Sequence, residues 1–337
     1  MTLHFVVPDA IDDPRRPSGG NVYDRRLSAE LVAAGWDVQE HRVAGQLDLA
    51  GLPDGATVLV DGLVATPAEA MVAEAARLRL VLLLHMTQAE PEVLHAVDAV
   101  VTTSQWARRW VLERHGPDPD RVHVAVPGVE AGSRVAGSAT GAHLLCVGPV
   151  TPDKGHDVLL AALGELNDLE WRCTCVGALD LAPAFVDRLR RSRAAARVEF
   201  TGPLTRAQLE EIRSTTDVVV SASRRESFGM AVAEGLARGI PVVATEVGGH
   251  PEAIGGAGAG LLVPPGDVDA LASALRRWLT EPQLQEQLRA AAATRRTNLT
   301  PWAETASTVS DVLSRVAAVN PAALVSVSPR NDHRTEG

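Results

Sequence analysis

Short apolar runs rich in β-branched residues alternate along the first half of the chain with stretches of helical periodicity. Strands that are buried on both faces have continuous apolar runs, and helices between them cover both faces of a parallel sheet. The pattern therefore predicts a parallel sheet covered by helices. The predicted strands are 3–7, 37–43, 57–60, 80–84, 99–102 and 122–126, and the predicted helices are 21–34, 67–77 and 105–115.

A stretch rich in Gly, Ser and Ala, residues 127–141, interrupts this alternation before it resumes at His143. Such composition is typical of a linker, so two doubly wound, Rossmann-like α/β domains are predicted. The boundaries are 1–127 for the first domain, 128–142 for the linker, 143–300 for the second domain, 301–319 for a final helix and 320–337 for a disordered tail. The second-domain strands are predicted at 144–147, 171–176, 198–201, 217–221, 241–244 and 261–263. Its helices are predicted at 155–166, 182–193, 206–213, 230–238, 268–279, 282–296 and 301–319.

Composition narrows the class of partner. The net charge of −10 and the 3% aromatic content argue against nucleic acid, and they give no indication of a membrane surface. Three cysteines are too few for a disulfide framework, and no Cys/His set with metal-ligand spacing is evident, so no metal is expected. The N-terminal segment fits a first strand rather than a signal peptide, and no apolar run is long enough to span a bilayer. A soluble, cytoplasmic protein is expected.

Two glutamates in the second domain are the first candidates for chemistry. Glu226 follows the strand 217–221, and Glu234 lies eight residues later on a helix expected to begin near Phe228. If the whole segment were helical, the two would be separated by roughly 12 Å along its axis, which suits two ends of one long ligand. The helix N-terminus would offer unpaired N–H groups to the same ligand. A capping glutamate and a surface glutamate remain an alternative.

A second candidate opens the second domain, where a strand leads to Gly148 and then to Lys154-Gly155 at the start of a helix. A lysine beside a helix N-terminus favours an anion. The glycine spacing is not that of a Walker A motif, and a capping turn with a solvated lysine is the alternative. In the first domain, Gly19-Gly20 permit close approach of a phosphate or sugar, and His85 follows a central strand. A plain loop and a structural histidine are the alternatives there.

Several of these segments together resemble glycosyltransferase family 4, the retaining, nucleotide-sugar-dependent transferases with the two-domain GT-B fold. The resemblance runs from Leu3 to about Val319 and is most specific in the second domain. The matching segments are ESFGMAVAEGLARGIPVVAT, with its Glu-x7-Glu pattern, VGPVTPDKGHDVLL, EVGGHPEAI, GLLVPPGD, SGGNVYDRRLSAELVAAGWDV, and TSQWARRW through VAVPGVE.

The resemblance implies a role for each candidate. Glu226 would contact the donor sugar near its reacting carbon, and Glu234 would bind the ribose hydroxyls. Lys154 and Gly148 would hold the diphosphate, with Gly19 and Gly20 helping from the first domain. His85 would lie near the sugar and the acceptor. The remaining donor contacts would come from the backbone of Phe228, Gly229 and Met230, and from Thr201 and Gly202 beside the base.

The implied activity is retaining transfer from a nucleoside-diphosphate sugar to a small-molecule, lipid or glycan acceptor, without a metal or other cofactor. The rivals are a nucleotide-sugar 2-epimerase, a phosphorylase-like enzyme, and a non-catalytic nucleotide-sugar-binding protein. The sequence does not identify the donor base, the sugar, the acceptor or the oligomeric state.

The chain departs from the family at one position, because the arginine that usually follows the glycine of the phosphate loop is Pro149 here. Proline neither donates a hydrogen bond nor brings charge. Arg224 or Arg225, next to Glu226, is the predicted substitute.

Overall fold

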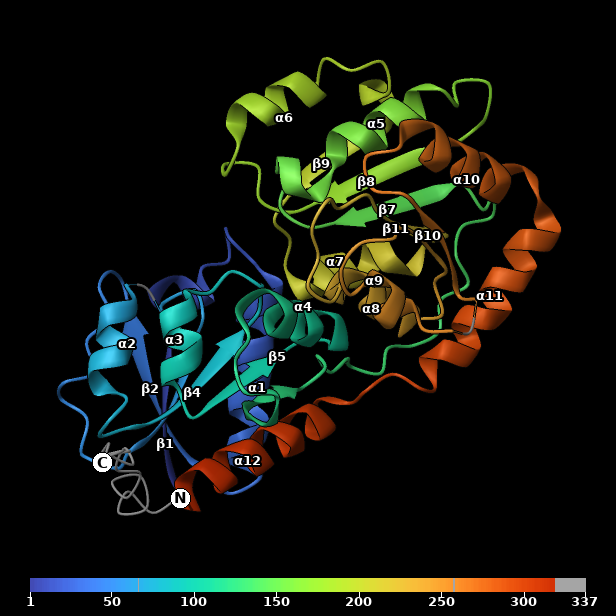
Figure 1. Cartoon of the computed structure of the whole chain (residues 1–337). Helices are drawn as coiled ribbons and strands as arrows, with labels where there is room; N and C mark the ends of the chain where they lie inside the picture. The colour runs from blue at the N-terminus through green and yellow to red at the C-terminus, as the bar shows by residue number, and fades with distance from the viewer. Residues whose placement is uncertain (66, 257, 319–337) are drawn as a thin grey trace, which may run out of the picture.

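Two parallel β-sheets, each flanked by helices, make up the computed structural model, which describes residues 1–65, 67–256 and 258–318 (Figure 1). Each sheet has six strands. The α/β class predicted from the apolar runs is therefore confirmed. The predicted tail, residues 320–337, lies outside the described residues.

The first sheet has the order β2-β1-β3-β4-β5-β6 and is parallel throughout. Its strands are β1 (Thr2–Pro8), β2 (Asp37–Val43), β3 (Thr57–Asp61), β4 (Arg79–Leu84), β5 (Ala99–Thr102) and β6 (Val122–Val124). The connecting helices are α1 (Gly19–Ala33), α2 (Ala68–Glu74), α3 (Pro91–Ala96) and α4 (Gln105–His115), with short 3-10 turns at Asp9–Asp12 and Pro119–Arg121. β3, β4 and β5 are buried along their whole length, as expected for strands covered on both faces.

The second sheet has the order β12-β11-β10-β7-β8-β9, again parallel. Its strands are β7 (His143–Val147), β8 (Arg172–Val176), β9 (Val198–Gly202), β10 (Val218–Ser221), β11 (Val242–Thr245) and β12 (Gly260–Val263). Its helices are α5 (His156–Gly164), α6 (Pro183–Leu189), α7 (Arg206–Ser214), α8 (Met230–Leu236), α9 (His250–Ile254), α10 (Val268–Thr280) and α11 (Pro282–Arg296), with 3-10 turns at Pro152–Lys154 and Ala195–Arg197.

Helix α12 (Trp302–Ala318) follows the second domain in sequence but packs on the first. Figure 1 shows α11 descending along the edge of the second domain and α12 running under the first sheet beside α1. The buried side chains of Trp302, Val309 and Leu313 join the same apolar cluster as Phe5 and Tyr23. The first core is therefore built from both ends of the described chain.

Each sheet has a point where the chain changes direction across it. In the first sheet this point lies between β1 and β3, and in the second between β7 and β10. The loops that leave the carboxyl ends of two such strands diverge to opposite faces and leave a place for a ligand. In the second sheet these loops are residues 148–155 and 222–229, and we refer to them as the phosphate loop and the glutamate loop.

The structure differs from the predicted elements mainly where helices are short or begin. Helices α3 and α9 were not predicted, because six and five residues hold too little periodicity to detect. Helix α8 begins at Met230 rather than near Phe228, since Gly229 takes a φ of 106°. Helix α1 begins at Gly19 rather than Asn21, because the Ser18 hydroxyl caps it by accepting a 3.0 Å hydrogen bond from the Asn21 N–H.

None of the helices in the described part of the chain combines the length and the apolar character needed to cross a membrane.

Candidate functional site

The phosphate loop is shaped by glycines and held against the glutamate loop. Gly148 and Gly155 have φ values of 153° and 66°, and Gly155 links the 3-10 turn to α5. A Cβ on Gly155 would lie 1.9 Å from the carbonyl oxygen of Ala222, which begins the glutamate loop. The two loops therefore touch through backbone at a position where only glycine fits.

We expect Gly155→Ala to destabilise the protein by at least about 3 kcal/mol, because it combines a left-handed backbone with a steric clash. Gly116→Ala is the matched control, since Gly116 has a φ of 64° and no atom within 4 Å of its Cβ position. That variant isolates the backbone cost and is expected to lose only about 1–2 kcal/mol. Urea unfolding of both variants measures the difference, and equal losses would contradict the close packing of the two loops.

Lys154 and Glu226 meet between these loops. The Lys154 ammonium lies 2.7 Å from Oε2 of Glu226, and their side chains are only 28% and 16% exposed. Burial acts to raise the pKa of Glu226, but the charge of Lys154 and the hydrogen bonds from Lys154 and Ser223 outweigh it, so the pKa is lowered. The carboxylate is therefore ionised and poised beside a cation at the direction-change point of the sheet.

Two side chains that the sequence reasoning did not identify complete the surroundings of Glu226. The Ser223 hydroxyl lies 3.3 Å from Glu226 Oε2, and His250 Nε2 lies 4.0 Å from it. His250 Nδ1 donates to the Thr245 carbonyl at 2.8 Å, which leaves Nε2 to accept from the Ser221 hydroxyl at 3.2 Å. Burial lowers the pKa of His250, in keeping with a neutral imidazole. His250 falls within the EVGGHPEAI segment, directly after a glycine pair, and this position could have marked it as a candidate site residue.

The glycine pair Gly248-Gly249 packs against the backbone of the glutamate loop. A Cβ on Gly248 would lie 1.6 Å from the Glu226 carbonyl oxygen, and one on Gly249 would lie 2.5 Å from Cα of Phe228. The Phe228 ring is itself buried, so only its backbone is available to a ligand. Gly229 caps α8 and Met230 begins it, which places the three predicted backbone positions at the start of that helix.

Glu234 lies on α8 within a network of charged side chains. It pairs with the guanidinium of Arg213, which is almost completely buried and also binds Glu210 at 2.7 Å. Arg238 continues the network through Glu210 and through the backbone carbonyl of Glu234 at 2.7 Å. The Glu234 side chain is 28% exposed, so the arginine orients a carboxylate that remains accessible.

Arg224 and Arg225, the predicted substitutes at the Pro149 position, both reach the phosphate loop region. Arg224 forms a bidentate ion pair with Asp157, with N···O distances of 2.8 and 2.9 Å. One guanidinium nitrogen of Arg225 lies 2.9 and 3.0 Å from the two carboxylate oxygens of Asp153. Both arginines are partly exposed. They therefore flank Lys154 but are paired with carboxylates in this state.

In the first domain, His85 belongs to a buried cluster that the sequence reasoning missed. Its Nε2 donates to Oδ1 of Asp24 at 2.7 Å, and Asp61 lies in the same cluster, with side-chain atoms of all three within 4.8 Å of one another. Burial lowers the pKa of His85, but the Asp24 carboxylate more than offsets this, so the pKa is raised. Burial raises the pKa of Asp61 to about 7. The three residues are 24 to 61 positions apart in sequence, so no local motif reveals them.

The two glycines of α1 face opposite partners. A Cβ on Gly20 would lie 3.1 Å from the His85 ring, and one on Gly19 would lie 3.2 Å from Sδ of Met230 in the second domain. The predicted first-domain glycines thus lie between His85 and the start of α8. This arrangement brings the candidates from both domains to one junction.

Further contacts hold this junction together. The Ser104 hydroxyl, which caps α4, donates to the Ser227 carbonyl at 2.6 Å. The Gln105 N–H donates to the Glu252 carboxylate at 2.8 Å. Thr201 and Gly202 lie apart from these contacts, at the carboxyl end of β9, where Gly202 has a φ of 75°. The junction therefore joins α1 and α4 of the first domain to the glutamate loop, α8 and α9 of the second.

The matches to known proteins agree with this geometry. Residues 136–295 match the family described as glycosyl transferases group 1. The D-inositol 3-phosphate glycosyltransferase of Kineococcus radiotolerans is 31% identical over 257 residues, which is 67% of this chain and 59% of that protein. The corresponding protein of Thermomonospora curvata is 32% identical over 269 residues, or 72% of this chain and 62% of that protein. The chain thus spans about three fifths of the length of these curated relatives.

Solved structures share the whole fold at low identity. A glycosyltransferase from Rickettsia africae superposes with a TM-score of 0.74 at 17% identity, covering 95% of this chain and 99% of that one. Sucrose-phosphate synthase from Thermosynechococcus elongatus gives 0.75 at 20% identity, covering 95% and 100%. Anabaena HepE in complex with UDP-glucose gives 0.74 at 18% identity, covering 94% and 100%. The predicted GT-B fold is therefore confirmed.

Proposed function

Because its second domain belongs to the glycosyl transferases group 1 family, we propose that this protein transfers a sugar from a nucleoside-diphosphate sugar to an acceptor nucleophile, with retention at the anomeric carbon. The observation that carries the proposal is the Lys154–Glu226 pair, 2.7 Å apart between two loops that leave adjacent strands. A cation and a buried carboxylate at this point suit a ligand with a diphosphate at one end and hydroxyls at the other.

In the proposed donor complex, Lys154 and Glu226 no longer pair with each other, and each binds the substrate instead. Lys154 binds the diphosphate, and Glu226 accepts hydrogen bonds from the sugar hydroxyls. Lys154 and the N-terminus of α5 stabilise the charge that builds on the leaving diphosphate, and fixed donors do so without reorganisation. The stabilising positive charge comes from the protein, so the proposed reaction requires no metal at the diphosphate.

Retention requires the acceptor oxygen to form its bond on the face of the anomeric carbon from which the diphosphate leaves. Retaining hydrolases use a carboxylate nucleophile against the anomeric carbon. In the proposed mechanism Glu226 instead binds hydroxyls, and the departing phosphate accepts the proton of the acceptor on the same face. His85, held by Asp24, faces the donor sugar and acceptor from the first domain, and closure of the junction excludes water.

The decisive experiment is a thermal-shift panel of nucleoside diphosphates and their sugars, followed by product analysis with the donor that binds. A ligand that binds only the native state stabilises it by about 2.7 kcal/mol at 100 times its Kd. UDP-glucose belongs in the panel because HepE binds it, and inositol 3-phosphate is one acceptor to test because of the names of the curated relatives. Transfer with an unchanged anomeric configuration, without added Mg²⁺ or Mn²⁺, supports the proposal.

Other outcomes would assign a rival. An isomerised donor without any acceptor would indicate a 2-epimerase, and sugar phosphate formation would indicate a phosphorylase-like enzyme. Tight donor binding without turnover against a broad acceptor panel would indicate a nucleotide-sugar-binding protein.

Replacing both Arg224 and Arg225 by alanine is expected to raise the donor KM about fivefold, which corresponds to about 1 kcal/mol for partly exposed charges. In the proposed complex these arginines turn from Asp157 and Asp153 toward the diphosphate and replace the positive charge that Pro149 lacks. Arg276→Ala serves as the control, since Arg276 forms a similar exposed pair with Asp168. An unchanged donor KM in the double variant would show that neither arginine takes this role.

A further inference from the structure

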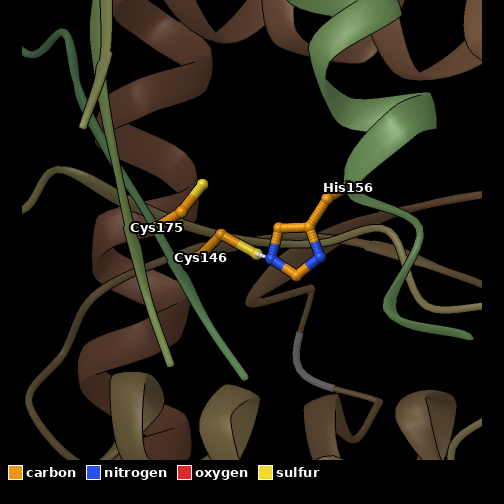
Figure 2. A group of neighbouring side chains, drawn as sticks. All are labelled: Cys146, His156 and Cys175. Atoms are coloured by element: carbon orange, nitrogen blue, oxygen red, sulfur yellow. Dashed lines mark hydrogen bonds between the residues drawn. The ribbon is translucent and has the colours of Figure 1, made fainter. Parts of the chain in front are cut away.

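Three soft ligand side chains converge in the core of the second domain. Cys146 on β7 and Cys175 on β8 lie opposite each other in the strand register, and His156 is the first residue of α5 (Figure 2). Their ligand atoms all lie within 4.8 Å of one another. The prediction from sequence that the cysteines lack a histidine partner is wrong, because the turn after β7 brings His156 back over the sheet.

This cluster is buried, and its imidazole makes few polar contacts with the described part of the protein. Cys146, His156 and Cys175 are 4%, 0% and 0% exposed. The imidazole has one polar contact, 3.6 Å from Nε2 to the Cys146 sulfur, and its Nδ1 has no hydrogen-bond partner among the described residues. A buried imidazole with so little compensation is costly in an apolar core.

The two thiols act on each other's pKa in opposite directions. Hydrogen bonding with Cys175 lowers the pKa of Cys146, and the neighbouring His156 lowers it further. The same contact raises the pKa of Cys175. A bound cation would deprotonate both thiols, as a coordinating thiol loses its proton to the metal.

We propose that Cys146, Cys175 and His156 bind a thiophilic divalent cation of the zinc class. Thiolate and imidazole are the donors that Zn²⁺ prefers, whereas Mg²⁺ and Ca²⁺ require oxygen ligands. Two thiolates and a neutral imidazole also cancel the charge of a divalent ion, which matters in a core where an unpaired charge is expensive. The three side chains would supply three of the four ligands that a zinc ion usually takes.

The position of the cluster gives the cation a structural effect. Cys146 lies two residues before Gly148, and His156 directly follows Gly155. A bound cation would thus link the residues on either side of the phosphate loop and fix the conformation of that loop. Metal binding at this cluster does not depend on the proposed sugar transfer.

The test is the metal content of the full chain, produced without a histidine tag in zinc-supplemented medium. Cys146→Ser and Cys175→Ser remove one ligand each, and Cys173→Ser is the matched control on β8, because Cys173 is equally buried but outside the cluster. We expect near-stoichiometric zinc in the unmodified chain and in Cys173→Ser. Loss of an outer-shell partner already lowers metal affinity about 10–100-fold, so both ligand variants should lose at least that much.

Cobalt titration of the metal-free chain gives a readout that needs no variant. Charge-transfer absorption from thiolate to Co²⁺ supports the proposal, and displacement by zinc should abolish the absorption. The proposal fails if the unmodified chain takes up neither metal, if Cys173→Ser loses metal as fully as the ligand variants, or if the metal-free chain contains a Cys146–Cys175 disulfide that forms regardless of metal.

Discussion

Replacing Lys154 by alanine is expected to lower kcat/KM for the nucleoside-diphosphate sugar by about 10²–10³-fold, the effect of losing one donor to a developing anion. The variant loses the cation that holds the diphosphate and leaves Glu226 with its 2.7 Å partner removed. Steady-state kinetics with the donor identified by thermal shift measures the change. Unfolding of the variant in parallel separates a lost contact from a lost fold.

Two further variants show whether Lys154 and Glu226 act as a pair. Lys154→Arg keeps the charge and should retain more activity than Lys154→Ala, although a planar guanidinium does not copy an ammonium. Glu226→Gln removes the carboxylate charge and should lose activity to a similar extent as Lys154→Ala. Because the two side chains contact each other, the double variant should lose much less than the product of the single losses. Full activity in Lys154→Ala would remove the phosphate loop from the mechanism.

Asp61→Asn is expected to stabilise the protein above pH 7 by up to about 4 kcal/mol, on the basis of 1.36 kcal/mol per pKa unit. The folded-state pKa of Asp61 is about 7, against an ordinary value of 3.8. Between about pH 4 and pH 7 the native state therefore still holds a proton that the unfolded state has already released. The free energy of unfolding falls as the pH rises through that window. Asparagine is neutral at every pH and removes this dependence.

The geometry allows asparagine to replace the protonated acid. Asp61 Oδ1 accepts a 2.8 Å hydrogen bond from the Leu63 N–H, and within the described ranges neither its Oδ2 nor Asp24 Oδ2 has a hydrogen-bond partner. The asparagine oxygen can keep the Leu63 contact while its amide N–H donates toward Asp24. His85 has a raised pKa as well, so its stabilising contribution is also lost as the pH rises.

Denaturant unfolding at pH 5 and pH 8 measures the effect. Asp48→Asn is the control, because Asp48 accepts from the N–H two residues ahead in the same way but lies exposed. That variant should show no pH-dependent gain. A wild-type stability that does not decrease between these pH values, or an Asp61→Asn variant that is less stable at pH 8, would contradict the prediction.

Much of the fold could be predicted because its strands carry their own signal. Strands such as β3 and β4 are buried on both faces, so continuous apolar runs mark them, and glycines mark many helix ends. Elements that depend on packing gave no such signal. Helices α3 and α9 are too short for a period, and the start of α8 is set by the backbone of Gly229 and not by side-chain pattern.

The candidate site divides in the same way. Glu226 and Lys154 could be identified because each lies in a short segment with a recognisable order of residues. Asp24, Asp61 and the cysteine–histidine cluster could not, because each group joins residues from separate strands and helices. Their proximity arises from the order of the strands within each sheet, which cannot be derived from a single sequence. The predicted roles of Glu226, His85, Lys154, Glu234, Thr201 and Gly202 stay predictions.

The packing of α12 on the first domain has a consequence for how the chain is made. A ribosome releases the first six strands long before Trp302 and Leu313 emerge, yet these side chains fill the core beside Phe5 and Tyr23. Domains at the start of a chain usually fold first during synthesis. Here the second domain has all of its strands and can mature while the first still exposes an apolar surface. The nascent first domain is therefore the part that most needs a chaperone, until α12 arrives.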